Sequence, residues 1–67
     1  MHPHAVSMVA NELGISEYDL FVLAHRAYFG SEPKHSAIEK QFGAWMMGDL
    51  KLPFYVQYFL DKGLFFA

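Results

Sequence analysis

Four histidines are the side chains in this sequence whose chemistry stands out, because imidazole binds transition metals and carries protons near neutral pH. His2 and His4 lie near the amino end, where a Cu(II) or Ni(II) site would need a histidine in third position. With Met1 in place, His4 is in fourth position, one place too late. Without Met1, His4 is in third position, but the preceding Pro3 has no amide hydrogen to lose to a bound metal. Weak chelation by His2 and His4 together is left as an alternative to a frayed polar end, which is the preferred interpretation.

The other two histidines also lack a convincing set of metal ligands. His35 and Glu39 are four residues apart and would share one face of a helix as ligands. Ser36, however, is a good helix cap, and a helix that starts there leaves His35 outside it. His25 falls among aromatic positions and is interpreted as a packed histidine. We therefore predict no metal site and no cofactor.

The sequence offers few residues that could carry out nucleophilic catalysis. There is no cysteine, and Ser16 and Ser36 are explained as helix caps. No glycine-rich phosphate loop is present, and no pair of carboxylates is placed by local spacing beside a base. A helical domain of 67 residues also has limited room for a ligand pocket of about 300 Å³ or more. We expect that the protein is not an enzyme.

Length and composition define the class of chain that carries these residues. A chain of 67 residues forms one domain, residues 1–67. Its hydrophobic content of 54% excludes a disordered segment. A formal net charge of −2 argues against a strongly basic nucleic-acid binder. No secretory signal is expected, and no uncharged stretch reaches the ~18–20 residues of a membrane span. With no cysteine, a reducing compartment is permitted, so a soluble, cytoplasmic protein is expected.

Glycines and prolines divide the chain into four segments with helical periodicity. Ser16 and Ser36 each begin a capping pattern, with an acidic residue three positions on, and Gly14 and Gly30 are typical of helix ends. A strand at residues 52–60 is the weaker alternative, because it would have no partner strand. We expect an all-α fold, a small bundle of three to four short helices. The expected helices span residues 3–13, 17–29, 36–47 and 53–62.

Two glycines in the carboxyl half have more specific interpretations. Gly43 lies inside the third predicted helix, where it weakens the helix or allows a close helix crossing. Gly63 is expected to end the last helix, with Leu64 folding back toward Phe59 in a Schellman motif.

Residues 6–25 resemble a helix-turn-helix motif. Ala10 stands where two helices would approach closely, and Gly14 and Ser16 supply the turn and the next cap. Leu20 and Leu23 follow where the second helix would pack back on the first. The resemblance covers about a third of the chain and concerns the motif alone. It implies a helical hairpin and, as an alternative function, a DNA-binding transcriptional regulator.

The side chains on the predicted recognition helix do not suit base reading. Arg, Lys, Asn and Gln match the hydrogen-bonding edges of bases, and phosphate contacts provide most of the affinity for DNA. The acidic Glu17 and Asp19 have the wrong charge for phosphate, and the four lysines are scattered. DNA binding is therefore possible but disfavoured. The outward positions of this helix are Ser16, Glu17, Tyr18, Phe21, Val22 and His25.

The same helix is apolar on two sides, which suggests a partner surface. At ~100° per residue, Leu20 and Ala24 lie on one face and Phe21 and His25 on the other. A helix that is apolar on both sides is buried on both sides, either by the rest of this chain or by another protein. We favour a protein–protein interaction module that forms a homo-oligomer; a small accessory subunit of a larger complex is a further alternative. The predicted interface residues are Tyr18, Phe21, Val22, His25, Phe29, Tyr55, Tyr58, Phe65 and Phe66.

Overall fold

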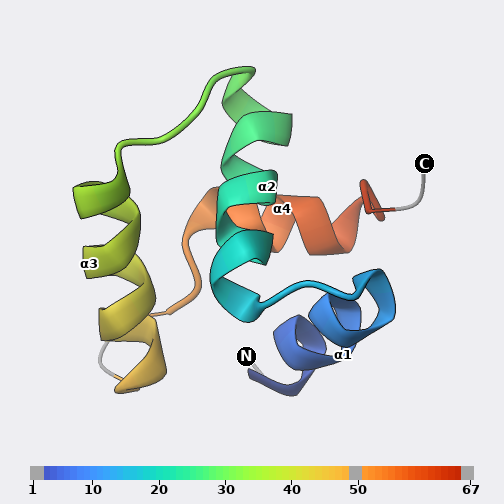
Figure 1. Ribbon diagram of the computed structural model, residues 1–67. Coiled ribbons are helices and arrows are strands. Elements are labelled where there is room, and N and C mark those ends of the chain that lie inside the picture. Colours follow the sequence, from blue (N-terminus) through green and yellow to red (C-terminus); the bar gives the residue numbers. More distant parts are fainter. Residues whose placement is uncertain (1–2, 49–50, 66–67) are drawn as a thin grey trace.

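The computed structural model describes residues 3–48 and 51–65, and these residues form four helices (Figure 1). No strand occurs among them, so the predicted all-α class is confirmed and the strand alternative at residues 52–60 is wrong. None of the helices in these two ranges is long and apolar enough to cross a membrane. The helices are α1 (Pro3–Leu13), α2 (Glu17–Phe29), α3 (His35–Met46) and α4 (Phe54–Asp61).

The turn between α1 and α2 follows the local rules that the sequence indicates. Gly14 has a φ of 70°, and the Ile15 N–H donates to the Ala10 carbonyl at 3.0 Å, which closes α1 in a Schellman motif. The Ser16 hydroxyl then accepts a hydrogen bond from the Asp19 N–H at 3.0 Å and caps α2. The two helices contact each other across this turn, and the resemblance to a helix-turn-helix motif stays a prediction.

The start of α3 differs from the prediction that Ser36 caps it. Lys34 is the N-cap, with an extended backbone and no side-chain hydrogen bond, and α3 begins at His35. The Lys34 carbonyl accepts from both the Ala37 and Ile38 N–H groups at 3.1 Å, so backbone bonds alone start the helix. The predicted cap is therefore wrong, and His35 belongs to α3.

The two carboxyl-half glycines give one correction and one confirmation. A Cβ atom added to Gly43 would meet no other atom within 4 Å, so Gly43 does not permit a close helix crossing. Gly63 has a φ of 65°, and the Leu64 N–H donates to the Phe59 carbonyl at 3.1 Å. The expected fold-back after α4 is thus confirmed at the backbone.

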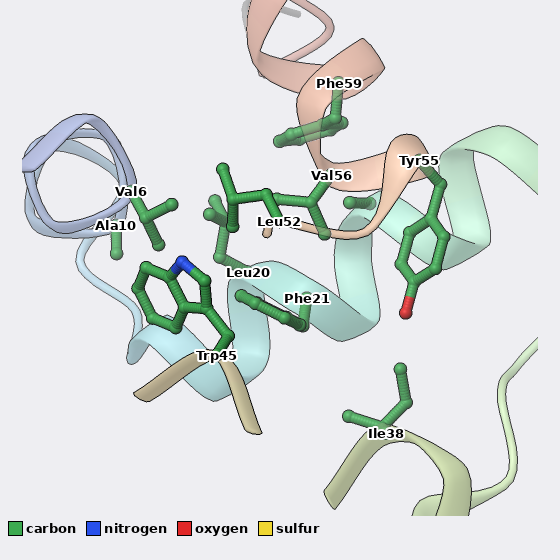
Figure 2. Packing of buried hydrophobic residues seen from close by; sticks show 11 residues of the cluster. Val6, Ala10, Leu20, Phe21, Ile38, Trp45, Leu52, Tyr55, Val56 and Phe59 are labelled. Atoms are coloured by element: carbon green, nitrogen blue, oxygen red, sulfur yellow. The ribbon is translucent and has the colours of Figure 1, made fainter. Parts of the chain in front are cut away.

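The core forms around α2, which contacts each of the other three helices (Figure 1). Leu20, Phe21 and Ala24 are completely buried on it. Phe21 on the second apolar side of α2 is therefore covered within this chain, whereas Phe29 on the same side is half exposed, and a partner protein at this side stays a prediction. The buried core residues, most of them labelled in Figure 2, are Val6, Ala10, Leu20, Phe21, Ala24, Ile38, Trp45, Leu52, Tyr55, Val56 and Phe59.

Aromatic rings make the contact between α2 and α3. The Phe21 ring lies 5.2 Å from Phe42 and 5.4 Å from Trp45, measured between centroids. Tyr18 adds an edge contact to Phe42 at 5.7 Å, and its hydroxyl is 3.1 Å from His35 Nδ1. Such aromatic pairs contribute ~0.5–1.5 kcal/mol each beyond the area they bury, so these contacts hold α3 against the central helix.

Candidate interaction surface

Four aromatic side chains form one exposed cluster where the end of α2 meets α4. Tyr28 is at its centre, with ring centroids 4.9 Å from Phe29, 5.2 Å from Phe54 and 5.3 Å from Tyr58. The exposed fractions are 44% for Tyr28, 49% for Phe29, 61% for Phe54 and 43% for Tyr58. We call these four residues the aromatic surface.

Local structure explains how these rings meet. Phe54 and Tyr58 are four residues apart and therefore share one face of α4. Tyr28 and Phe29 occupy the last turn of α2, and Gly30, with a φ of 75°, ends the helix directly after them. The helices α2 and α4 cross (Figure 1), and the rings of Phe54 and Tyr58 on the first turns of α4 contact Tyr28 near the end of α2.

Two of the predicted interface residues lie on the aromatic surface, namely Phe29 and Tyr58. Two others are in the core: Phe21 is completely buried and Tyr55 is 3% exposed, so their prediction as surface residues is wrong. The Phe42 ring on α3 covers Phe21. Tyr55 contacts His25 on α2 and Gln41 on α3. Phe21 therefore cannot contact a partner while the domain is folded, and Tyr55 reaches the surface only as part of the groove lining.

The remaining predicted residues are partly covered by this chain. Tyr18, Val22 and Phe65 pack against the core, and the Phe65 ring lies 5.9 Å from Phe59. His25 is half-buried, between the rings of Phe29 and Tyr55. These residues are not part of the aromatic surface. Phe66 lies outside the described residues.

Sequence reasoning missed Tyr28 and Phe54. Neither is among the predicted interface residues, although their neighbours Phe29 and Tyr55 are. The available signal was the run of two adjacent aromatics directly before Gly30, where a helix end leaves little chain to cover them.

A groove lies beside the aromatic surface, between the end of α2, the start of α3 and the start of α4. Its volume is 390 Å³, and its lining includes Phe29, Phe54 and the buried Tyr55. The Tyr55 hydroxyl donates to Gln41 Oε1, and burial raises the pKa of this tyrosine above its usual value of 10.0. The expectation that this small domain has little room for a ligand is therefore corrected.

Polar contacts surround the aromatic surface. Arg26 Nε donates to Glu32 Oε2 at 2.6 Å in an exposed ion pair, which contributes at most ~1 kcal/mol. The Lys62 ammonium lies 5.9 Å from the centre of the Tyr58 ring, within the range of a cation–π contact. An apolar centre with a polar border is the usual anatomy of a protein interface.

The histidines do not assemble into a metal centre in the described part of the chain, where no group of three or more potential ligand side chains is found. His35 and Glu39 do share α3, yet His35 Nδ1 contacts the Tyr18 hydroxyl. His25 Nδ1 lies 3.0 Å from the Ser31 carbonyl, to which it must donate because a carbonyl only accepts. His2 lies outside the described residues.

Comparisons of the chain with family models, with curated proteins and with solved structures find no match. We therefore infer the function from the chemistry of the aromatic surface and the groove.

Proposed function

We propose that this protein is a small protein–protein interaction module that self-associates through its aromatic surface. The observation that carries the proposal is the cluster in which the Tyr28 ring contacts three other rings, each of the four between 43% and 61% exposed. Exposed apolar clusters on a small domain mark partner surfaces, and Tyr and Phe are enriched in the centres of interfaces. We also propose a cytoplasmic location, with which a chain that has no cysteine is compatible.

Self-association suits the chemistry of this surface. In a twofold dimer the same patch meets itself, so every group must tolerate its own copy. The aromatic surface contains no charged side chain, and ring edges and ring faces complement one another. A standard interface covers ~800 Å² per partner, roughly a sixth of the 4620 Å² accessible surface of this chain. The four rings would then form the centre of an interface whose polar border includes Arg26, Glu32 and Lys62.

The DNA-binding alternative has no specific support from the geometry. Glu17 and Asp19 occupy the first turn of α2, where a recognition helix would approach phosphates and bases. Carboxylates there repel the DNA backbone. The accessory-subunit alternative uses the same aromatic surface with a foreign partner, and the experiment below separates it from self-association.

The test is sedimentation equilibrium of the purified chain and of the variant Phe54→Glu over a range of concentrations. Phe54 is the first residue of α4, and a carboxylate is favoured at a helix amino terminus, so this variant should keep its helix. Loss of a central aromatic anchor costs at least ~2 kcal/mol of binding, about a 30-fold weaker dimer. Met8→Glu is the matched control, because Met8 is 54% exposed on α1, away from the aromatic surface.

We expect the wild type and Met8→Glu to dimerise alike and Phe54→Glu to sediment as a folded monomer, with far-UV circular dichroism as the check on folding. A wild type that stays monomeric at all concentrations would overturn self-association and leave a foreign partner. A Phe54→Glu variant that dimerises as tightly as the wild type would exclude the aromatic surface as the interface.

A further inference from the structure

The groove beside the aromatic surface has the size and lining of a small-molecule site. Four ring-bearing residues border it, His25, Phe29, Phe54 and Tyr55, with centroids 4.5 Å apart for His25 and Phe29 and 5.8 Å apart for Phe29 and Tyr55. An apolar cavity of ~150 Å³ is enough for benzene. The 390 Å³ of this groove therefore accommodates one aromatic ring and a short chain attached to it.

A hydrogen-bond donor is available in the groove lining. Gln41 Oε1 accepts the Tyr55 hydroxyl hydrogen, which fixes the orientation of the Gln41 amide. The Nε2 group of Gln41 then carries two hydrogens, and no acceptor for them occurs among residues 3–48 and 51–65. This amide offers its hydrogens to a bound acceptor.

The charges at the groove favour an anion. Glu32 and Lys34 are its two charged lining residues. The Glu32 carboxylate already pairs with Arg26, whose Nε lies 2.6 Å away. Lys34 pairs with no carboxylate within the part of the chain that the structure describes. Arg26, Glu32 and Lys34 together carry a formal charge of +1 beside the groove, and the Lys34 ammonium on its flexible stem can reach an anion in it.

We infer that this groove binds a small organic carboxylate that carries one aromatic ring. The ring enters among His25, Phe29, Phe54 and Tyr55, and the carboxylate accepts hydrogen bonds from Gln41 Nε2 and the Lys34 ammonium. Charge complementarity selects this occupant over a neutral or cationic ring compound. The inference goes beyond the proposed self-association, because Lys34 and Gln41 are not part of the aromatic surface.

The experiment is a titration of the isotope-labelled chain, followed by amide chemical shifts. The probes are 3-phenylpropionate, 3-phenylpropanol and 3-phenylpropylamine, which share a ring and differ in charge. The variant Lys34→Gln removes the ammonium at a position where the side chain makes no cap. Ala37→Phe fills the groove from the exposed side of α3, and Lys40→Gln is a control on α3 outside the groove.

We expect 3-phenylpropionate to shift the Ala37 and Gln41 amides and to bind about fivefold more tightly than the alcohol, with the amine weakest. Lys34→Gln should abolish the difference between acid and alcohol, Ala37→Phe should abolish binding, and Lys40→Gln should behave as wild type. Equal affinities for the three probes in the wild type, or no shifts at millimolar concentration, would overturn the inference.

The outcome is separable from that of the proposed function. Phe29 and Phe54 belong to both the groove and the aromatic surface, so the two properties are separated by their readouts. Ligand binding is read at the Ala37 and Gln41 amides and depends on Lys34, whereas self-association is read by sedimentation without a ligand. Shifts confined to Tyr28 and Tyr58 would show the probes adhering to the aromatic surface, and would likewise overturn the groove as a site.

Discussion

Replacing Phe21 by alanine tests the core most sharply, because the sequence pattern placed this ring on a surface and the structure places it at the centre. Phe21 has no exposed area and contacts the rings of Phe42 and Trp45. Phe21→Ala removes the ring from α2 where α3 packs against it. The surrounding helices would be left around a cavity that they can only partly fill.

The magnitude of the loss follows from burial. A buried Phe→Ala change costs ~3–5 kcal/mol, the sum of a transfer term and a cavity term. A domain of this size has a net stability of ~3–5 kcal/mol when no disulfide or metal supports it, and this chain has no cysteine. Phe21→Ala should therefore leave the chain largely unfolded at 25 °C.

The assay is urea denaturation monitored by far-UV circular dichroism, at chain concentrations too low for self-association. The matched control is Phe29→Ala, the same change on the same helix at a side chain that is 49% exposed. We expect Phe29→Ala to lose about 1–2 kcal/mol, since a half-exposed ring gives up only part of its burial. Equal losses for the two variants, or a loss below ~1 kcal/mol for Phe21→Ala, would refute this account of the core.

Two further predictions concern backbone conformation and alkaline pH. Gly43→Ala should raise the free energy of unfolding by ~0.5–1 kcal/mol, because Gly43 is helical with open space around it. Gly30→Ala should lower the free energy of unfolding by ~1 kcal/mol, because Gly30 has a φ of 75°, which alanine adopts only with strain. Urea denaturation measures both, and shifts of the same sign would contradict the assignment. Burial raises the Tyr55 pKa, so the unfolded chain releases this proton at lower pH than the folded chain. The contribution of protonated Tyr55 to the free energy of unfolding is fully present below pH 10.0 and is lost as the pH rises through the pKa of Tyr55 in the folded chain. Tyr55→Phe should therefore show a smaller fall in unfolding free energy between about pH 9 and pH 11 than the wild type, and an equal fall would count against this cause.

Helix ends were predictable where short-range chemistry decides them. Gly14, Gly30 and Gly63 each adopt the positive φ that glycine takes most easily, and Ser16 caps α2 through its own hydroxyl. The prediction failed at Ser36, whose pattern looks the same. There the extended Lys34, two residues before Ser36, supplies a backbone carbonyl, so no side-chain cap is used.

The candidate surface was less predictable, because exposure depends on which helices meet. The periodicity of α2 indicates two apolar sides, and it cannot tell whether this chain or another protein covers them. The packing of α3 and α4 decides that Phe21 is buried and that Phe29 is half exposed. Tyr28 and Phe54 become neighbours only through the packing of α4 against α2.

The groove depends on the same long-range arrangement. Gln41 on α3 and Tyr55 on α4 are fourteen positions apart in sequence and meet through one hydrogen bond. No local sequence pattern predicts that contact, so the ligand site at the groove can be inferred only from the folded chain.

The most direct test of the central claim, that the aromatic surface joins two copies of this chain, is an isotope-filtered NOE experiment on a mixture of labelled and unlabelled protein. This measurement reports only contacts between different molecules. We predict intermolecular NOEs from the ring protons of Tyr28 and Phe54, the two residues at the centre of the surface. Intermolecular NOEs confined to other exposed side chains, such as Met8 or Met47, would contradict the account, as would their absence at millimolar concentration.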